Sequence, residues 1–428
     1  MKTLGNYPRV AVIGQGAREH AITWKLAQSH LEPVLYALPG NPGMWELAAK
    51  VDIPLSEHAK IVEWVKAERI DFVVIGPEQP LAEGLVDALQ EAGIPVFGPN
   101  RAAAQLEASK SFAKDVMRRA GVPTARYEVF TEVAAAQAFA AALGAPVVIK
   151  ADGLAAGKGV VVAQTLAEAN SAIADMLEGN RFGASGHKVV IEEFLRGTEV
   201  SLMYFVDGNT VVPMIPARDF KRVGDGDTGP NTGGMGAFAP VPSFLSANWT
   251  AFATERIIEP TVQYLKSEGI TYRGVLYAGL MVTQEGPKVI EFNARFGDPE
   301  TEVVLPLLET DLLEIMWAVA HDELGELDVR WHEKAAVCVV LAGGEYPAKS
   351  DSGTPIELAS DRPSGVYVFH AGTALRGDQL VTAGGRVLTV SAVAQDIPAA
   401  IELVYGALDV ARFSGMQYRR DIASHWQQ

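Results

Sequence analysis

Cysteine is almost absent from this 428-residue sequence, which contains only Cys338. A single thiol forms no intramolecular disulfide and cannot supply the cysteine set of a zinc site. Cys338 lies in the run Ala335-Ala336-Val337-Cys338-Val339-Val340-Leu341, whose apolar character predicts a buried strand. We therefore expect a packing role for this thiol and a reducing compartment, most simply the cytoplasm.

Basic side chains are also in deficit. The chain has 36 Lys and Arg against 52 Asp and Glu, which gives a formal charge of -16 and a pI near 5.0. Nucleic-acid binding relies on clustered Lys and Arg that release counterions, so the composition argues against such a partner. No apolar run reaches the length of a membrane span, and no basic segment with an apolar core opens the chain. We expect neither a nucleic-acid partner nor a membrane, and local basic groups must hold any anionic substrate.

Apolar residues are plentiful, at 48%, and the chain is long enough for several domains. Near its start, short apolar runs alternate with helix-like stretches. This alternation predicts a parallel, doubly wound sheet with ligands beyond the carboxyl ends of its strands, at Gly14-Gln15-Gly16 and Gly76-Pro77-Glu78. The expected strands are 9–14, 33–38, 71–76 and 95–98, and the expected helices are 18–29, 58–68 and 81–91.

The first of these loops is not a dinucleotide fingerprint. In Gly14-x-Gly16-x-x-Glu19, the glutamate stands where that fingerprint needs a third glycine for close helix packing. An anion near this helix start, with Arg18 and His20 beside it, fits better, because free backbone N–H groups favour negative charge. His20 fits equally well as a helix-surface or core histidine.

A second glycine-rich loop lies between the apolar runs 147–150 and 160–162, which predict a hairpin. Lys150 and Lys158 accompany the loop and favour polyphosphate binding over a simple tight turn. The loop is not a Walker A motif, because three residues rather than four separate Gly153 from the glycine before Lys158. Around the hairpin we expect helices at 101–120, 131–143 and 165–178, and strands at 189–195 and from Glu199 onward.

A further hairpin, predicted at 275–293, ends in a chemically distinctive stretch. Alternation along its second strand separates a polar side from an apolar side: Glu291, Asn293 and Arg295 against Ile290, Phe292 and Ala294. A carboxylate and an amide oxygen two residues apart suit Mg²⁺, which shares its remaining positions with water and phosphates. A half-buried strand with a solvated polar face accounts for the same alternation equally well.

The remaining segments complete the expected organisation. The stretch 224–236 is rich in Gly, Asp, Asn and Pro and has no periodicity, so we expect a functional or disordered loop. From Trp331 onward the sequence consists mainly of strand-like runs, and we expect a small α+β domain there. Its predicted strands are 335–341, 366–369 and 381–393 and its predicted helix is 397–413, while the preceding region has helices at 249–268 and 311–320.

Taken together, these blocks resemble the ATP-grasp ligases, and within them the phosphoribosylamine–glycine ligase family. The most specific match is the block Arg295-Phe296-Gly297-Asp298-Pro299-Glu300-Thr301-Glu302. Other matching blocks follow in the family's order: 16–21, 76–78, 150–159, 227–236 and 369–373. The resemblance covers nearly the whole chain.

The resemblance implies an α/β and α+β multidomain protein with an ATP-grasp fold. An N-terminal pre-ATP-grasp domain with a doubly wound parallel sheet would span 1–108, and a small C-terminal α+β domain would span 331–428. Between them, an ATP-grasp domain at 109–330 would include a lid subdomain at about 124–194.

The same resemblance implies an enzyme of purine biosynthesis that acts as a monomer on small molecules. ATP would convert glycine to glycyl phosphate, and the amine of 5-phosphoribosylamine would displace phosphate to give glycinamide ribonucleotide. Mg²⁺ or Mn²⁺ would be held by Glu291 and Asn293. No protein nucleophile is needed, so positioning and charge stabilisation would supply the catalysis.

Site residues follow from the resemblance position by position. The implied ATP-binding residues are Lys110, Lys150, Asp152, Gly153, Gly157, Lys158, Gly159, Glu192, Glu193, Phe194, Leu195 and Glu199. Within this set, 152–159 would form the lid loop, 192–195 the hinge against adenine, and Glu199 the acceptor for ribose hydroxyls. Neighbouring strand positions point oppositely, so at most one of Glu192 and Glu193 can face the nucleotide.

The implied catalytic residues are Arg295, Asp298 and Lys221. Arg295 would hold the glycine carboxylate or the developing acyl phosphate, because a guanidinium fork suits planar oxyanions. Asp298 would orient the glycine amine, although a turn-capping role fits it equally well. The implied substrate-binding residues are Gly14, Gly16, Arg18, Glu19, Glu78, Asp219, Lys221, Asn231 and Gly297. For Lys110 and Asp219, the alternative is an ordinary solvated charge.

Two rival functions remain open at this point. A different ATP-grasp carboxylate–amine ligase would share the metal strand and the glycine-rich lid but should lack the 295–302 block. A non-catalytic nucleotide-binding protein would not need both Glu291 and Asn293.

Overall fold

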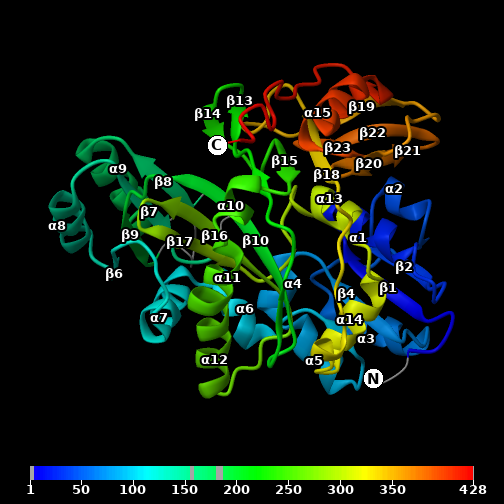
Figure 1. Ribbon diagram of the computed structural model, residues 1–428, viewed down its shortest axis with the longest axis horizontal. Helices are drawn as coiled ribbons and strands as arrows, with labels where there is room; N and C mark the ends of the chain where they lie inside the picture. Colours follow the sequence, from blue (N-terminus) through cyan, green and yellow to red (C-terminus); the bar gives the residue numbers. More distant parts are fainter. Residues whose placement is uncertain (1–3, 155–158, 180–186, 428) are drawn as a thin grey trace.

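The computed structural model describes residues 4–154, 159–179 and 187–427. Its N-terminal sheet is parallel, with strand order β3-β2-β1-β4-β5, and lies at the right of Figure 1. The doubly wound sheet predicted from the alternating pattern is therefore confirmed. The strands are β1 (Arg9–Gly14), β2 (Val34–Pro39), β3 (Ala49–Lys50), β4 (Phe72–Ile75) and β5 (Val96–Phe97).

Two helices predicted as continuous are each broken in the structure. Gly84, with φ +89°, separates α4 (Glu78–Glu83) from α5 (Leu85–Glu91). Ser109 is extended and separates α6 (Arg101–Ala108) from α7 (Lys110–Ala120), where its hydroxyl accepts the N–H of Phe112 as a helix cap. The other helices of this region are α1 (Ala17–Leu26), α2 (Pro42–Trp45) and α3 (His58–Ala67).

A separate lobe, at the left of Figure 1, contains an antiparallel sheet of order β6-β9-β7-β8 covered by α8 (Val133–Leu143) and α9 (Leu166–Leu177). Buried alanine and branched aliphatic side chains fill the space between helices and sheet. β7 and β8 form the predicted hairpin. The strands are β6 (Tyr127–Phe130), β7 (Val147–Ala151), β8 (Val160–Ala163) and β9 (Val189–Glu193).

The central sheet has the order β11-β10-β16-β17 and carries the predicted metal strand at its edge. The helix expected at 249–268 is α11 (Trp249–Ala253), a π-helical turn (Thr254–Ile258) and α12 (Glu259–Ser267). Its neighbour is the short α10 (Pro242–Ser246). The strands are β10 (Thr198–Val206), β11 (Val211–Pro213), β16 (Gly274–Thr283) and β17 (Gly286–Asn293).

A β-bulge in β17 corrects the predicted facing of its side chains. Gly279 of β16 pairs with Glu291, but the next residue pairs with Val289, so Ile290 is the extra residue. Val289, Phe292 and Ala294 are buried in the main core, whereas Ile290 is only half-buried and does not join them. The prediction that Ile290 shares the apolar side was wrong, because the bulge reverses the alternation at that residue.

The segment 218–239 joins the C-terminal strands in one sheet of order β12-β15-β18-β23-β20. Part of the predicted loop at 224–236 is instead a hairpin of β13 (Arg222–Gly224) and β14 (Thr228–Asn231). Cys338 is buried in β18, as predicted. The sheet strands are β12 (Arg218–Asp219), β15 (Gly236–Ala239), β18 (Ala335–Ala342), β20 (Val366–His370) and β23 (Arg386–Ala394).

The end of the chain differs from the prediction in two places. The run expected as one strand at 381–393 is divided between β22 (Gln379–Gly384) and β23. The helix expected at 397–413 is shorter, because α15 (Ile397–Gly406) is followed by β24 (Ala411–Phe413), which pairs with β19. The remaining elements are β19 (Asp351–Leu358), β21 (Thr373–Arg376), α13 (Thr301–Val304) and α14 (Leu312–Ala320). In the described ranges, no helix has the length and apolar character to cross a membrane.

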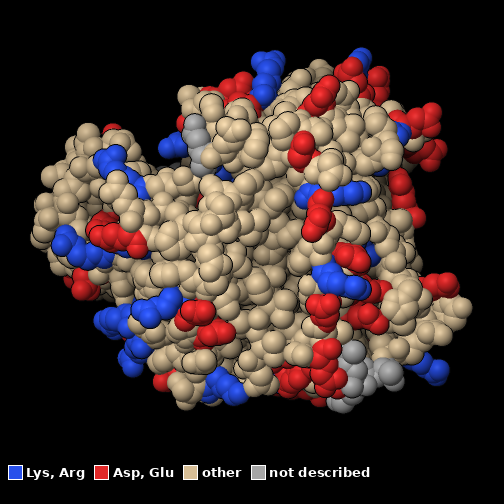
Figure 2. All heavy atoms as spheres, in the orientation of Figure 1, with Lys and Arg blue, Asp and Glu red and all other residues tan. Residues whose placement is uncertain are grey.

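Figure 2 shows one face of the molecule with Lys and Arg side chains scattered among Asp and Glu. On this face a notch separates the lobe of α8 and α9 from the part that holds the sheet β12-β15-β18-β23-β20 and the elements after it, which we call the C-terminal lobe. The two lobes are thus distinct bodies joined through the central sheet.

Candidate active site

The end of β17 brings the predicted metal ligands into a field of positive charge. Burial alone would raise the pKa of Glu291, but Lys221, Lys150 and Lys110 outweigh it and lower that pKa. Across the described ranges, Glu291 makes no ion pair and no side-chain hydrogen bond. Its carboxylate is therefore kept ionised without being neutralised by a direct partner.

The donor set at this edge fits a hard divalent cation. Glu291 supplies a carboxylate and Asn293 an amide oxygen, which are the ligand types that Mg²⁺ and Mn²⁺ accept. In the described part of the chain, no group of three or more His, Cys, Asp and Glu side chains could hold a metal alone. A cation held by these two residues would therefore depend on further oxygens, such as those of a bound polyphosphate.

Glu192 is the centre of a buried ion cluster. Its Oε1 lies 3.0 Å from Lys150 Nζ and its Oε2 lies 3.1 Å from Lys114 Nζ. Burial lowers the pKa of Lys114 to about 8 even though Glu192 opposes that shift. Lys150 Nζ also donates to the carbonyl of Ile290, at 2.9 Å. The cluster thus ties the lobe sheet to the bulge of β17, and Lys114 is a member that the sequence did not reveal.

Glu193 points away from this cluster. Its Oε1 accepts the backbone N–H of Arg126 at 2.9 Å. The two neighbouring glutamates therefore point to opposite sides of the strand, as their adjacent positions predict. Because β9 ends at Glu193, Phe194 and Leu195 lie in the connection from the lobe sheet to the central sheet.

The start of the glycine-rich loop is attached to the beginning of α7. The carboxylate of Asp152 accepts hydrogen bonds from the Ser111 hydroxyl at 2.6 Å, the Ser111 N–H at 3.0 Å and the Ser109 hydroxyl at 3.1 Å. Lys110 Nζ donates to the carbonyl of Gly153 at 3.0 Å. Asp152 therefore caps a helix in this structure. Gly159 immediately precedes β8, and the predicted residues Gly157 and Lys158 lie outside the described residues.

Charged residues from β10, from β12 and from the segment after β12 lie close together. Lys221 Nζ lies 2.9 Å from Glu199 Oε2. Burial raises the pKa of Asp219 to about 7, Lys221 opposes the shift, and Glu300 and Glu199 add to it. The pKa of Lys221 is in turn raised, because Asp219 and Glu199 more than offset its burial.

Arg295 is held on several sides. Its Nη2 lies 2.9 Å from Glu107 Oε1 and donates to Asn293 Oδ1 at 3.2 Å, and its Nε lies 3.5 Å from Glu78 Oε2. The pKa of Arg295 is raised despite burial, because Glu107 and Glu78 stabilise its charge. Glu107 was not predicted, and its place in an ordinary helical stretch offers no sequence signal.

The first glycine-rich loop is closed by its own glutamate. Glu19 Oε2 accepts the N–H of Gly16 at 2.6 Å, and Glu19 Oε1 accepts from Arg18 Nε at 2.6 Å. A side chain at Gly14, whose φ is +126°, would overlap Glu19. The carboxylate of Glu19 thus takes the N–H position at which an external anion was expected, while Arg18 lies between Glu19 and the carbonyl of Phe296.

The block after β17 connects the site to the C-terminal lobe. Asp298 Oδ1 lies 2.9 Å from Arg386 Nη1, which also donates to the carbonyl of Gly233 at 2.7 Å. Gly297 has no room for a side chain, because a Cβ there would meet the carboxylate of Glu300. Asn231, in contrast, is exposed on β14. Asp298 therefore has a structural partner, and Asn231 is the predicted residue least integrated into the site.

His20 is a buried core histidine rather than a surface one. Its Nδ1 accepts the N–H of His370, which joins α1 to β20, and its ring lies edge-on to Phe369. Burial and the nearby His370 lower its pKa well below the usual value. His20 thus fastens the N-terminal sheet to the C-terminal lobe.

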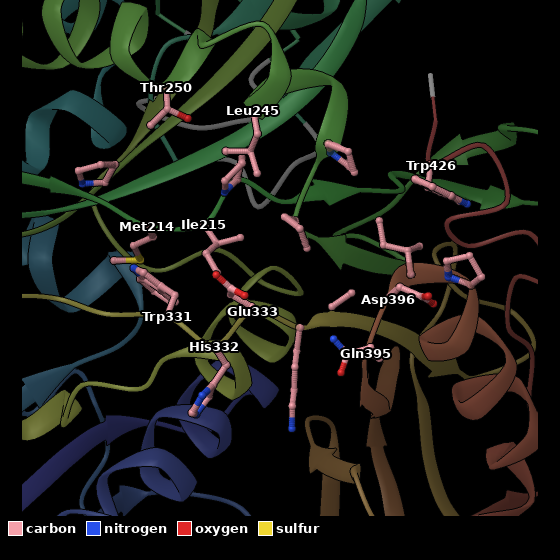
Figure 3. Close-up of a pocket in the computed structure, with 18 residues that line it drawn as sticks. Met214, Ile215, Leu245, Thr250, Trp331, His332, Glu333, Gln395, Asp396 and Trp426 are labelled. Carbon is pink, nitrogen blue, oxygen red and sulfur yellow. The ribbon is translucent and has the colours of Figure 1, made fainter.

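A separate hollow of about 550 Å³ lies between the central sheet and the C-terminal lobe, as Figure 3 shows. Trp331 and Met214 lie on one side of it, and Trp426 and Asp396 on the other. Its lining residues include none of the predicted site residues. The hollow therefore has no part in the site described above.

The fold is that of an ATP-grasp enzyme, as the match of an ATP-grasp domain model to residues 108–301 shows. The structure superimposes on a biotin carboxylase domain from Hydrogenobacter thermophilus, solved with MgADP, with a TM-score of 0.75 at 18% identity, covering 96% of this chain and 91% of that one. At this identity the similarity concerns the fold alone.

Family comparisons narrow the class. The N, ATP-grasp and C domains of phosphoribosylglycinamide synthetase match residues 8–107, 108–301 and 336–425. The chain therefore belongs to the phosphoribosylglycinamide synthetase family. Its relatives include the phosphoribosylamine–glycine ligases of Rhizobium meliloti, 48% identical over 97% of both chains, and of Escherichia coli K12, with the same identity and coverage. The Thermotoga maritima enzyme of that name has a TM-score of 0.86 at 34% identity, covering 97% of this chain and all of its own.

Proposed function

We propose that this chain uses ATP to join glycine to 5-phosphoribosylamine, through glycyl phosphate, giving glycinamide ribonucleotide, ADP and phosphate in purine biosynthesis. Membership of the family supports the overall reaction. The observation that carries the chemistry is the end of β17, where Glu291 is ionised, has no ion-pair partner among the described residues, and lies beside Asn293 and Arg295 among lysines.

In the first step, a glycine carboxylate oxygen attacks the γ-phosphorus of ATP and ADP leaves. Oxide is too poor a leaving group for direct attack by an amine, so this step gives the carbonyl a phosphate leaving group. We assign Lys110 and Lys150 to the ATP phosphates, because both are cations within the field of Glu291. Glu291 and Asn293 would hold Mg²⁺ or Mn²⁺, which offsets phosphate charge when bound.

In the second step, the amine of phosphoribosylamine attacks the acyl carbon, phosphate leaves, and the amine loses a proton. We assign Arg295 to the glycine carboxylate and the acyl phosphate oxygens, since its guanidinium carries a firmly held charge. Asp219 and Lys221 face the phosphoribosylamine, with Glu78, Arg18 and the first glycine-rich loop. A pKa of about 7 suits Asp219 to accept the proton that the amine releases.

The remaining assignments extend this proposal to the nucleotide. Residues 192–195 form the hinge beside adenine, and Glu199 accepts from the ribose hydroxyls after exchanging its contact with Lys221. The division 1–108, 109–330 and 331–428 gives the working domains, with the lobe at about 124–194 as lid. We also propose a monomer, as the family resemblance implies; sedimentation at micromolar concentration tests this.

The decisive experiment supplies purified protein with ATP, Mg²⁺, labelled glycine and freshly generated phosphoribosylamine. ADP and labelled glycinamide ribonucleotide should form together, and only when both co-substrates are present. ADP release that needs neither glycine nor phosphoribosylamine would contradict the proposal. Turnover with bicarbonate or formate in place of glycine would favour a different ATP-grasp ligase.

A further inference from the structure

Glu107 joins the end of α6 to the end of the metal strand. Its side chain is only 8% exposed. One carboxylate oxygen, Oε2, accepts the N–H of Ala294 at 2.7 Å, and the other, Oε1, lies 2.9 Å from Arg295 Nη2. Glu107 therefore restrains the backbone at Ala294, directly after Asn293, and the guanidinium of the next residue, Arg295.

Glu107 also acts on Asn293, the proposed metal ligand, because one nitrogen of Arg295 contacts both side chains. Arg295 Nη2, which faces Glu107, also donates to Asn293 Oδ1 at 3.2 Å. The Nε atom of the same guanidinium is buried and has no hydrogen-bond partner among the described residues, although Glu78 lies 3.5 Å away. With Glu107 removed, Glu78 would be the remaining ion-pair partner of the guanidinium among the described residues, and Arg295 would shift towards it and away from Asn293.

We propose that Glu107 is a positioning residue for the ligation reaction, holding Arg295 and Asn293 in one geometry at the end of β17. The inference rests on the proposed function for its substrate, glycine. A carboxylate is needed here because two donors, the Ala294 N–H and the Arg295 fork, each require an acceptor oxygen. A glutamine offers one acceptor oxygen and places its amide N–H groups against the other donor.

The test replaces Glu107 by Gln and measures kcat, the KM for glycine and the thermal unfolding midpoint. We expect kcat to fall by roughly 10- to 100-fold, since a misplacement of about 1 Å can cost about 10²-fold. The KM for glycine should not rise, because Arg295 keeps its charge and loses a competing carboxylate. A glycine KM that rises while kcat is unchanged would overturn the proposal.

Glu68→Gln is the matched control. It removes a glutamate that pairs with Arg9 at 2.8 Å on the surface, and neither residue belongs to the site described above. Its kcat and KM should equal those of the wild type. If Glu107→Gln does not fold, Glu107→Asp serves instead, because it keeps the charge but is too short to reach both donors. A folded Glu107→Asp variant with wild-type kcat overturns the proposal.

A double-mutant cycle separates positioning from general structural support. If Glu107 acts through Arg295, adding Glu107→Gln to Arg295→Ala should lower kcat by less than about twofold further. Fully multiplicative losses contradict the inference.

Binding of glycine in the presence of Mg²⁺ and a non-hydrolysable ATP analogue, followed by calorimetry, gives a readout independent of turnover: affinity should be retained in Glu107→Gln. Absence of ligation by the wild-type protein would instead count against the proposed function, while this binding comparison still tests Glu107.

Discussion

Among the described residues, lysines lie near both Glu192 and Glu291, but only the carboxylate of Glu192 is in direct contact with them. Glu192 touches Lys150 and Lys114 directly, at 3.0 and 3.1 Å, with all three side chains almost fully buried. Glu291 feels Lys150, Lys110 and Lys221 only through space, and these cations lower its pKa. One charge is neutralised inside the protein, and the other is held ready for an external partner.

The difference separates a residue that supports the site from one that can bind a ligand. A paired carboxylate offers little attraction to a cation, because neighbouring ammonium groups already neutralise it. An ionised carboxylate without a contact partner keeps its lone pairs free for a metal. Lys150 links the two carboxylates, because its ammonium contacts Glu192 and also helps to lower the pKa of Glu291.

The largest effect should come from removing the unpaired carboxylate. We expect Glu291→Ala to lower kcat by roughly 10³-fold, because metal-assisted charge stabilisation contributes several kcal/mol to the transition state. Steady-state kinetics with varied Mg²⁺ measure this. The unfolding midpoint should also fall, because the lowered pKa of Glu291 means that its charge stabilises the folded chain at neutral pH. A near-normal rate at saturating ATP and ordinary Mg²⁺ refutes a role in metal binding.

The next largest effect should come from changing Arg295, the cation beside Glu291 and Asn293. Arg295→Lys keeps a positive charge but loses the fork that meets Glu107 and Asn293 together. We expect kcat to fall by about 10²-fold, as for a misplaced contact in the reacting geometry. Comparison with Arg295→Ala shows how much of the loss the charge alone restores. Kinetics equal to the wild type would make Arg295 a structural residue only.

The sequence predicted the fold well where periodicity is local. The alternating N-terminal segments and the hairpin around the second glycine-rich loop are present as predicted. Elsewhere, single residues interrupt the predicted periodicity. Ser109 ends one helix and caps the next, and Ile290 forms a bulge in a strand. Ser109 also donates to the distant Asp152, and the bulge depends on the register in which β17 pairs with β16, so local periodicity could not reveal either feature.

The site was predictable in its residue types but not in its pairings. Glu291 and Asn293 stand out in the sequence because they alternate along a strand beside a specific block. Glu107 and Lys114 carry no comparable signal, since charged residues in amphipathic helices are usually solvated. Their burial arises only when α6 and α7 pack against β17 and β9. The assignment of Asp152 to ATP likewise overlooked its contacts with Ser109 and Ser111.

A smaller effect on turnover, but a large one on stability, should follow loss of the paired carboxylate. Glu192→Gln leaves Lys150 and Lys114 buried without their counter-charge, so we expect about 3 kcal/mol of destabilisation or more, measured by urea unfolding. Glu193→Gln is the control, because that side chain faces the other way and accepts a single backbone N–H. It should cost about 1 kcal/mol. Equal costs for the two variants would mean that the ion pairs of Glu192 with Lys150 and Lys114 do not stabilise the fold.

Asp219 provides the finest test, because it is a carboxyl that is neither paired like Glu192 nor kept ionised like Glu291. Burial raises its pKa from 3.8 to about 7. Between these values the folded chain retains a proton that the unfolded chain has lost, so this group's contribution to stability falls as pH rises. The stability of the wild type relative to Asp219→Asn should therefore decrease from about pH 4 to about pH 7 and then level off. Urea unfolding of both proteins across that range measures the difference. Parallel stability curves would mean that Asp219 is ionised in the folded protein, and that the lysine field at Glu291 extends to it as well.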